Sequence, residues 1–529
     1  MGATSDLPLR DSLGGDSGPS AQYRGATAIA GPVLGTAFDQ LRFAASVAFG
    51  LPFSVVSLDR LVGATLATRH EFNTLGADGT EIVGGPALNA ADRREMQVRR
   101  FRAQARRAAR ETSYYSRLFQ RLALDPTRLR AEDIDALPLT RKEALRSEPD
   151  AFVRTSAKPA FRTTTTGTTG RPTGVSFSLH ELQVYIALNA IGFLVDGQIG
   201  PEDVVQISAS ARATLGNTCV AGACARIGAQ VYLAGLVAPE LGLRLLSEDR
   251  ALAGKKPRAS VLDTYPSYLG RLVEAGRKLG YGPADFGLEQ IIVGGEIVTA
   301  GLKARAARHF GPVSFHEGYG MTEIWPQGAI RCEAGHLHFE PSRGLVEVLD
   351  PETGRPAAPG AVGTIVATPF PPYRETTLVL RYDTEDLVHA VAGPLTCRLH
   401  HLPATSDLLG KRRLAVRDEN GWTTPRQVLE ALEAVAAVPL PARCGFWAVP
   451  GGVAVEVLVR DQSSEVRRAV ADSLEGQGVP LRELRLFEDR GELTCPLPLR
   501  DDLEELGFPA RGSEVVTPPS MLAAHRELA

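Results

Sequence analysis

The chain has 529 residues, of which 44% are hydrophobic and 22% are charged, and its 58 basic and 61 acidic residues give a formal charge of -3. This composition is typical of a folded protein with a buried core and argues against a disordered or collagen-like chain. The nearly balanced charge gives no electrostatic reason to expect a nucleic-acid partner, and six cysteines are too few for a disulfide-stapled scaffold. The length suits about three domains, or one large domain with a smaller one.

The first 90 residues contain no motif that suggests a role. Residues 1–20 are polar and rich in glycine and serine, and they lack the basic start and the apolar run of a secretory signal. The most apolar early stretch, residues 43–58, is interrupted by Gly50 and Pro52 and is too short to span a membrane. We therefore treat residues 1–90 as an N-terminal extension of unknown role and expect a cytoplasmic protein without a membrane partner.

Residues 91–122 place apolar side chains at helical spacing, among them Met96, Phe101 and Ala105, and this pattern predicts one long helix. Its outer face is rich in arginine. We interpret that face as solvated rather than as a nucleic-acid patch, because acidic residues elsewhere in the chain balance its charge.

From about residue 175 to residue 370, strand-like apolar runs alternate with helix-like segments. This alternation predicts parallel sheets that are covered by helices. The predicted strands are residues 204–208, 230–233, 258–262 and 290–293, and the predicted helices are residues 219–227 and 266–280.

The C-terminal part has a different order of elements, in which two strands precede an amphipathic helix and a third strand. The predicted strands are residues 446–449, 454–459 and 484–488, and the predicted helix is residues 463–475. The sequence therefore predicts an α/β fold. A large N-terminal domain of layered sheets and helices covers residues 91–408, and a small α+β domain covers residues 409–529.

A loop rich in threonine and glycine carries the first chemical signal. Between Thr163 and Gly174 it has seven threonines and three glycines. Glycines let backbone N–H groups converge on an anion, and hydroxyls add donors without bulk, so the loop suits a triphosphate. It does not match the G-x-x-x-x-G-K-[ST] pattern, and a plain solvent loop is the alternative. The candidate phosphate-binding residues are Thr163, Thr164, Thr165, Thr166, Gly167, Thr168, Thr169 and Gly170.

Three further motifs follow in order: Gly294-Gly295-Glu296 after an apolar run, then Tyr319-Gly320-Met321-Thr322-Glu323, then the segment 381–386, which reads RYDTED. With the threonine-rich loop, in this order and spacing, they resemble the adenylate-forming superfamily of acyl-CoA synthetases, aryl-acid ligases and peptide-synthetase adenylation domains. The resemblance is strongest to the phenylacetate–CoA ligase branch. It runs from about residue 96 to about residue 508 and includes residues 137–142 and 264–267.

The resemblance implies a role for each motif. The threonine-rich loop is expected to hold the β- and γ-phosphates of ATP, Gly295 and Glu296 to line the adenine, and Tyr319 to stack on the base. It also implies a mobile C-terminal domain that acts as a lid, rotating between two half-reactions.

The remaining implied roles concern the sugar, the α-phosphate and the metal ion. Thr322 is expected to contact the α-phosphate, Glu323 to help hold Mg²⁺, and Asp386 to bind the ribose hydroxyls. Elementary chemistry agrees, because one carboxylate has acceptors for two hydroxyls and Mg²⁺ prefers oxygen ligands. Attack by a carboxylate on the α-phosphorus then depends on positioning and charge neutralisation. The alternative is that these acids are ordinary loop residues.

Two thiols and several imidazoles occur in paired short spacings: Cys332 is followed by His336 and His338, and Cys397 by His400 and His401. Two cysteines and two histidines make a closed tetrahedral zinc site, and members of the resembled branch sometimes carry such a structural zinc. We expect the ligands to be Cys332, His338, Cys397 and His400. The choice within each histidine pair stays open, and coincidence is the alternative.

The chain departs from the family at its C-terminal end. The family places a catalytic lysine in the small domain, but the last lysine here is Lys411. Arg500 stands near the expected place, and either Arg500 or Lys411 is a candidate for neutralising charge during catalysis, although a guanidinium is not equivalent to an ammonium. In the ribose motif, Glu385 replaces the usual glycine. Specialised chemistry and loss of thioester formation both explain these departures.

The resemblance also indicates where an acyl group would bind. Small residues in these segments leave room for an aryl ring, although helix packing alone also explains Cys219 and Val220. A loop histidine such as His316 is more often incidental than a substrate ligand. The candidate substrate-binding residues are Asn217, Cys219, Val220, His316, Gly318 and Gly320.

The sequence thus predicts Mg²⁺-ATP-dependent activation of a small aryl or related acid as an acyl adenylate. Pyrophosphate would be released, and the acyl group would pass to CoA or another acceptor. One alternative is activation of nitrite to diazotise an aromatic amine, or amide formation, in a natural-product pathway. Another is a degenerate nucleotide-binding protein without turnover. A monomer or a homodimer is expected.

Overall fold

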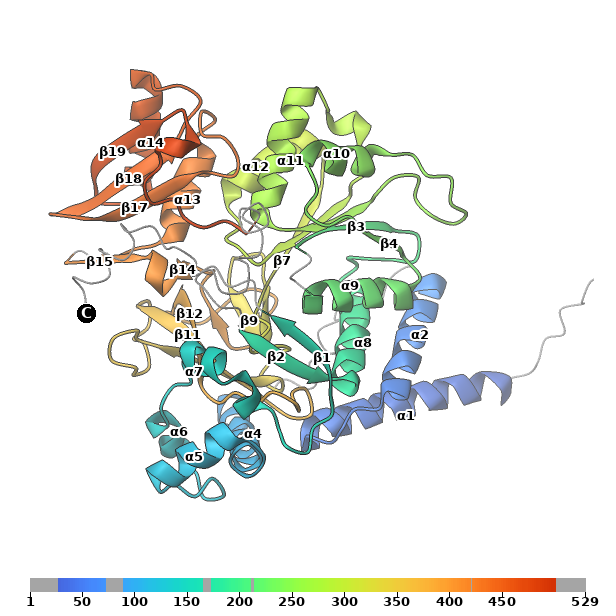
Figure 1. The fold of residues 1–529 in the computed structure, drawn as a ribbon. Coiled ribbons are helices and arrows are strands. Elements are labelled where there is room, and N and C mark those ends of the chain that lie inside the picture. Colours follow the sequence, from blue (N-terminus) through green and yellow to red (C-terminus); the bar gives the residue numbers. More distant parts are fainter. Residues whose placement is uncertain (1–26, 73–88, 165–172, 211–213, 420, 501–529) are drawn as a thin grey trace, which may run out of the picture.

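The computed structural model describes residues 27–72, 89–164, 173–210, 214–419 and 421–500, and its largest sheet runs through the middle of the molecule (Figure 1). Eight strands form this central sheet in the order β13-β9-β8-β7-β6-β5-β3-β4. Strands β3 to β7 pair in parallel, whereas β8, β9 and β13 pair antiparallel. Their bounds are β3 Val204–Ser208, β4 Gln230–Leu233, β5 Val261–Thr264, β6 Gln290–Gly294, β7 Ser314–Gly320, β8 Gly328–Arg331, β9 Leu337–Phe339 and β13 Ala404–Thr405.

Helices cover both faces of the parallel strands. Val205 and Val261 belong to one hydrophobic cluster, whereas their chain neighbours Val204 and Leu262 belong to another. Successive side chains of a strand point to opposite faces, so each cluster marks one face of the sheet. This architecture confirms the predicted α/β fold. The first face packs against α8 Leu179–Val195 and α9 Thr214–Ile227, and the second against α10 Pro239–Ser247, α11 Pro266–Leu279 and α12 Ala300–Phe310.

Two smaller sheets stand beside the central one. The antiparallel sheet β10-β11-β12-β14 brings β14 against β12, where Lys411 pairs in register with Asp386. The hairpin β1-β2 flanks the threonine-rich loop. Their bounds are β1 Pro159–Thr164, β2 Gly174–Ser178, β10 Gly344–Leu349, β11 Val362–Pro369, β12 Tyr382–His389 and β14 Gly410–Lys411.

Most predicted elements of this region are confirmed with small shifts. Residues 204–208 and 230–233 are strands as predicted, and the predicted helix over 266–280 ends one residue early. The predicted strand over 258–262 starts later, at Val261, and the predicted helix over 219–227 already begins at Thr214.

The predicted single helix over residues 91–122 is wrong, because the structure has two helices, α4 Ala90–Glu111 and α5 Ser113–Leu122. Between them, Thr112 has extended backbone with φ -126° and ψ 138°. Its hydroxyl donates to the carbonyl of Ala108 at 2.8 Å and accepts from the N–H of Tyr115. A threonine side chain that satisfies free backbone groups at both helix ends stabilises this break.

The arginine-rich face of α4 is only partly solvated. Arg99, Arg106 and Arg110 are exposed, as expected. Arg100 is buried instead, and its guanidinium donates to the carbonyl of Ser342 at 2.6 Å. One arginine of this face therefore fastens α4 to the segment that precedes β10.

Two helices from the first 90 residues, α1 Thr27–Phe49 and α2 Val55–Phe72, pack on the large part of the molecule (Figure 1). Phe53, Leu58 and Val62 are buried in the same cluster as α8 and α9. These helices therefore contribute to the core around the central sheet, a role that was not predicted for residues 1–90.

Residues 416–500 form a separate α+β unit, which we call the C-terminal unit. Its own hydrophobic cluster includes Val428, Val455 and Val470. Strands β17 and β18 pair antiparallel, and β19 joins β18 in parallel. The predicted elements are confirmed with small shifts, and the domain boundary at residue 408 stays a prediction. The bounds are β15 Val416–Asp418, β16 Gly421–Thr423, α13 Pro425–Ala434, β17 Cys444–Val449, β18 Gly452–Leu458, α14 Ser464–Gly476 and β19 Leu481–Phe487.

Polar contacts hold the C-terminal unit against α11 and α12. Arg460 lies 2.7 Å from Glu274, and the carboxylate of Glu430 accepts from the N–H of Ala300 at 2.9 Å. Within the described ranges, no helix has the length and apolar character that crossing a membrane requires.

Candidate active site

One continuous cavity of about 2290 Å³ brings most of the predicted site residues together. It opens at the carboxyl ends of β5, β6 and β7 and reaches the C-terminal unit. This is the edge where parallel α/β sheets commonly bind ligands. The predicted residues that line it are Thr164, Asn217, Cys219, Val220, Gly295, Glu296, His316, Gly318, Tyr319, Gly320, Thr322, Glu323, Asp386, Lys411 and Arg500.

Asp386 lies at the centre of a small polar network. The hydroxyl of Tyr319 donates to its Oδ2 at 3.0 Å, and the Nζ atom of Lys411 lies 2.9 Å from its Oδ1. Lys411 also donates to the carbonyl of Thr384 at 2.9 Å. Burial raises the pKa of Tyr319 well above its usual value, so its hydroxyl keeps its proton and remains a donor. A carboxylate is thus fixed at the cavity wall by one hydroxyl and one ammonium.

Glu385, the residue before Asp386, stands where the resembled family usually has glycine. Glu385 has φ +60°, which is a left-handed backbone conformation that favours glycine. Its N–H donates to Oδ1 of Asp383 at 3.0 Å, and its carboxylate lies 3.8 Å from Arg413. The departure from the family pattern therefore leaves the local turn in place.

Glu323 is fully buried and faces two polar groups. Its Oε1 atom lies 3.4 Å from Nζ of Lys142 and accepts from the hydroxyl of Tyr382 at 3.3 Å. Lys142 begins α7 Lys142–Ser147 and also lines the cavity. No role was predicted for this lysine. The available signals were its rarity, because the chain has only seven lysines, and its position at the end of the segment 137–142, which shares the family resemblance.

Of the predicted phosphate loop, the structure describes the two ends, which belong to the β1-β2 hairpin. Thr164 lines the cavity, and the hydroxyl of Thr163 is hydrogen-bonded to that of Thr214 at the start of α9. Thr165, Thr166, Gly167, Thr168, Thr169 and Gly170 lie outside the described residues.

Arg500 reaches the cavity from the C-terminal unit and meets the predicted adenine segment. Its backbone N–H donates to Oε1 of Glu296 at 2.6 Å, and its Nε donates to the carbonyl of Gly295 at 2.8 Å. Its guanidinium lies 5.1 Å from the ring centroid of Tyr265. The other oxygen of Glu296 accepts from the N–H of Ser267 at 2.9 Å. Arg500 of the C-terminal unit is thus in direct contact with Gly295 and Glu296, which follow β6.

A Cβ atom at Gly295 would lie 3.2 Å from Arg500 and 3.3 Å from the ring of Tyr265, and the residue has φ +82°. Both facts favour glycine at this position. Burial raises the pKa of Glu296, while hydrogen bonds from Ser267 and Arg500 oppose that rise.

The side of the cavity where the sequence predicts acyl binding is formed by α9 and β7. Asn217 donates to the carbonyl of Ser210 at 3.0 Å, and Val220 is half-buried. Cys219 is buried in the cluster of α8 and α9, and burial raises the pKa of its thiol to about 12, so the thiol packs as a neutral group. Asp263 on β5, which is half-buried, also lines the cavity. No motif of the sequence points to it.

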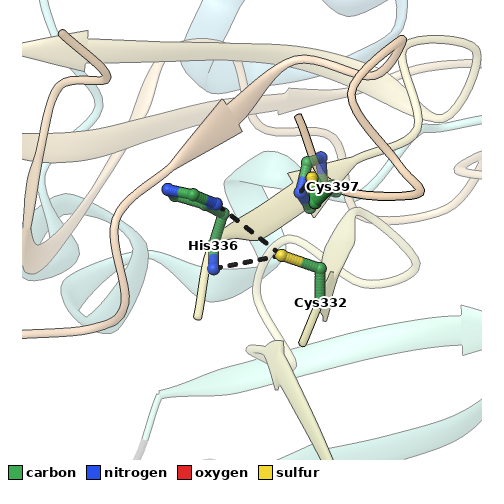
Figure 2. Close-up of side chains that lie close together, drawn as sticks. Cys332, His336 and Cys397 are labelled. Carbon is green, nitrogen blue, oxygen red and sulfur yellow. Dashed lines mark hydrogen bonds between the residues drawn. The ribbon is translucent and has the colours of Figure 1, made fainter. Parts of the chain in front are cut away.

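The metal-ligand cluster differs from the expected set at one position. Ligand atoms of Cys332, His336, His338 and Cys397 all lie within 4.8 Å of one another, whereas His400 is not in this group. Figure 2 shows the sulfur of Cys332 facing the ring of His336, at 3.7 Å from its Nδ1. The Sγ atom of Cys397 lies 3.3 Å from Nε2 of His338.

The backbone explains the exchange of His400 for His336. A turn through Gly335, at φ +82°, brings His336 back over Cys332 between β8 and β9. The Nδ1 atom of His400 lies 3.0 Å from the carbonyl oxygen of Cys397 instead. The short spacing of Cys397 and His400 therefore marks a local turn, and the cluster is completed by a residue of the hairpin.

The chain matches the family model described as AMP-binding enzyme over residues 96–368, which is more than half of its length. It is 28% identical over 333 residues to a phenylacetate-coenzyme A ligase from Thermus thermophilus, covering 61% of this chain and 72% of that protein. It is 26% identical over 316 residues to a phenylacetate-coenzyme A ligase from Aromatoleum evansii, covering 58% and 68%.

Solved structures of 2-hydroxyisobutyryl-CoA ligase share the fold. The postadenylation state in complex with R3-HIB-AMP has a TM-score of 0.62 at 18% identity and covers 79% of this chain and 92% of that chain. An open conformation in complex with 2-HIB-AMP and CoA has a TM-score of 0.56 at 18% identity, covering 76% and 89%.

Proposed function

Because the chain belongs to the AMP-binding enzyme family and to its phenylacetate–CoA ligase-like branch, we propose that this AMP-forming ligase activates a small aryl carboxylic acid and passes the acyl group to coenzyme A. In the first half-reaction, a carboxylate oxygen of the acid bonds to the α-phosphorus of ATP. The bond from that phosphorus to the α–β bridging oxygen breaks, and pyrophosphate leaves. In the second, the sulfur of CoA loses its proton and bonds to the acyl carbon, and AMP leaves.

The single observation that carries this proposal is the convergence of three charged pairs on one cavity. Asp386 with Lys411, Glu323 with Lys142, and Glu296 with Arg500 come from separate parts of the chain and line the same space. A carboxylate binds a ribose diol, cations neutralise phosphate charge, and the backbone near Gly295 borders a flat base. The ribose, the phosphates and the base of a nucleotide would each have a suitable group in this cavity.

Each pair then has a part in the first half-reaction. Asp386 accepts hydrogen bonds from the ribose hydroxyls, while Tyr319 and Lys411 hold its carboxylate in place. Thr322 donates to the α-phosphate, and Lys142 balances negative charge on the phosphates. Because phosphoryl and nucleotidyl transfer need little covalent help from the protein, orientation and charge are the main contributions.

Magnesium fits the donor set at Glu323, where a buried carboxylate oxygen faces the phosphate end of the cavity. Glu323 would hold the ion, whose chemistry is to neutralise phosphate oxygens and orient the leaving pyrophosphate. Lys142 lies beside this carboxylate and limits how far it can move.

Arg500 takes the place of the lysine that other family members supply from the small domain. It approaches the cavity from the C-terminal unit and carries a fixed positive charge next to Gly295. A guanidinium can donate two hydrogen bonds at once to carboxylate or phosphate oxygens. We assign it to the developing charge between the acid and the α-phosphate.

The cluster of Cys332, His336, His338 and Cys397 completes the proposal as a structural zinc site. Two thiolates and two imidazoles satisfy the tetrahedral preference of Zn²⁺ and leave no open position for a substrate. Their separation within 4.8 Å suits ligands around one ion. The ion would fasten the β8-β9 hairpin to the segment that precedes β13.

The absence of lysine after Lys411 favours a second candidate, in which the activated group is nitrite and the acceptor is an aromatic amine. Amide formation is a related outcome. Both alternatives use the same adenylation site. They differ from thioester formation in the nucleophile that attacks the mixed anhydride.

Pyrophosphate release with Mg²⁺-ATP tests these candidates. The panel holds phenylacetate, hydroxybenzoates, aminobenzoates and cinnamates, each with and without CoA, and nitrite with aminobenzoates. Release that requires an acid supports adenylation, and formation of a CoA thioester supports the second step. Release that requires nitrite favours diazotisation. ATP binding without release in any arm contradicts the proposed turnover.

A further inference from the structure

Asp263, Ile292 and His316 form a row across three neighbouring strands of the central sheet. Asp263 on β5 is in register with Ile292 on β6, and Ile292 is in register with His316 on β7. All three residues line the cavity. Because neighbouring strands lie about 4.8 Å apart, the acid and the imidazole stand roughly 10 Å apart with the isoleucine between them. The row is an apolar platform with a polar group at each end.

Both polar groups lack partners in the described part of the chain. No hydrogen bond or ion pair among the described residues reaches the carboxyl of Asp263, and Nε2 of His316 is buried without a hydrogen-bond partner. Glu317, next to His316 in the chain, is engaged by Lys303 at 2.7 Å. A buried polar atom is normally satisfied, so Nε2 of His316 points to a missing ligand group, and the half-buried carboxyl of Asp263 lines the same cavity without a protein partner.

The surroundings of Asp263 indicate the kind of group that is missing. Its register neighbours on β3 and β6 are Ile207 and Ile292, and no cationic side chain among the described residues compensates its charge. Burial alone raises the pKa of its carboxyl to about 7. A carboxyl in such a place is stabilised by a ligand that donates a hydrogen bond, and it disfavours the carboxylate end of a substrate.

We propose that Asp263 and His316 determine substrate specificity, and that the activated acid is an aryl acid with a hydrogen-bond donor, an amino or hydroxyl group, on its ring. The ring packs on Ile292, the donor binds Asp263, and His316 contacts a polar group at the other end of the platform. This inference rests on the proposed adenylation function. It adds the hydrogen-bond donor on the aryl ring, which the proposed function does not specify.

The test is the pyrophosphate-release rate, expressed as kcat/KM, for amino- and hydroxybenzoates against benzoate and phenylacetate. A site built to bond a donor discriminates strongly against analogues that lack it. We expect the wild type to prefer the donor-bearing acids by at least about ten-fold. Asp263→Leu should remove that preference, and the loss of rate should fall mainly on the donor-bearing acids. Asp263→Asn should give an intermediate preference.

The thermal stability of the variants distinguishes a role of Asp263 in substrate specificity from a structural role. Removing the half-buried carboxyl of Asp263, which has no protein partner among the described residues, should keep or raise the Tm, because no internal hydrogen bond is lost. The control is Asp203→Asn, since Asp203 is a buried carboxyl held by Lys256 and Ser260, each at 2.8 Å. That variant should lower the Tm and leave the acid preference as in the wild type.

Two results would overturn the inference. Equal or better rates with unsubstituted acids in the wild type would show that no ring donor is recognised. A lowered Tm for both Asp263 variants with unchanged preference would make the residue structural. These results leave adenylation itself intact, whereas absence of release with every acid contradicts the proposed function and this inference together.

Discussion

The Nζ atom of Lys411 lies 2.9 Å from Oδ1 of Asp386, and the two residues are register partners on β14 and β12. Opposite residues of an antiparallel pair present their side chains on one face, so the pairing itself sets this contact. Lys411 is also the last lysine of the chain and stands where the second sheet leads into the C-terminal unit. The part of the cavity that we propose to bind the nucleotide is thereby joined to the connection on which lid rotation would depend.

Asp386→Ala should raise the KM for ATP by at least about ten-fold, because the ribose would lose two charge-assisted hydrogen bonds. The measurement is the initial rate of pyrophosphate release at varied ATP. Glu385→Gly is the matched control on the same turn, since glycine suits its φ of +60°. That control should keep the ATP dependence of the wild type. Normal ATP affinity and turnover in Asp386→Ala would make the ribose assignment wrong.

Arg500→Ala should slow adenylate formation by about 10²-fold, the cost typical of removing one donor to a developing charge. Thioester formation from acyl adenylate supplied directly should be much less affected. Arg500→Lys should recover part of the loss, because it restores charge without the planar fork. The control is Arg482→Ala, an exposed arginine of the same unit. An equal loss in both half-reactions would instead indicate that Arg500 only positions the C-terminal unit.

The purified protein should contain about one equivalent of zinc, because a closed structural site is nearly fully occupied. His336→Ala should lose the metal and lower the Tm, whereas His400→Ala should retain it. Elemental analysis and thermal unfolding measure both effects. Less than about a tenth of an equivalent in the wild type would contradict the site. Loss of zinc in His400→Ala but not in His336→Ala would restore the ligand set expected from the sequence.

Asp263 should make stability depend on pH in a defined direction. Burial raises the pKa of its carboxyl from its ordinary value near 4 to about 7. Between these values the folded protein keeps a proton that the unfolded chain has lost, so the free energy of unfolding falls as pH rises from about 4 to about 7. Asp263→Asn removes this fall, and its advantage over the wild type should grow across that window to about 4 kcal/mol at most.

Urea unfolding of the ligand-free protein at pH 4.5 to 8 measures this difference. Asp249→Asn is the control, because Asp249 is exposed and paired with Arg258 at 2.7 Å. It should show no growing advantage as the pH rises. A constant difference between Asp263→Asn and the wild type across the window would mean that Asp263 has an ordinary pKa.

Much of the fold follows from hydrophobic patterning. The strand over 204–208 and the helix beginning at Pro266 match the prediction, because buried parallel strands give continuous apolar runs and amphipathic helices give a regular period. The break at Thr112 was missed, since a single capping side chain overrides a helical pattern that continues on both sides.

The site was predictable only where its residues form motifs. Lys142 ends a segment that shares the family resemblance but had no predicted role, and Asp263 belongs to no motif. Their importance depends on register and on contacts between separate segments of the chain. The choice of His336 over His400 depends on the turn at Gly335, which spacing alone does not specify. Such details need the folded backbone, because Lys142 and Glu323 are neighbours in space although they are 181 positions apart in the chain.

The most direct test of the central claim is acid-dependent exchange of radioactive pyrophosphate into Mg²⁺-ATP by the wild type and by Asp386→Ala. Exchange reports reversible formation of an acyl adenylate, and it needs no assumption about the final acceptor. The account predicts exchange that is absent without an acid, present with a suitable aryl acid, and strongly reduced in Asp386→Ala. Exchange that is independent of any acid, or equal in wild type and variant, would contradict it.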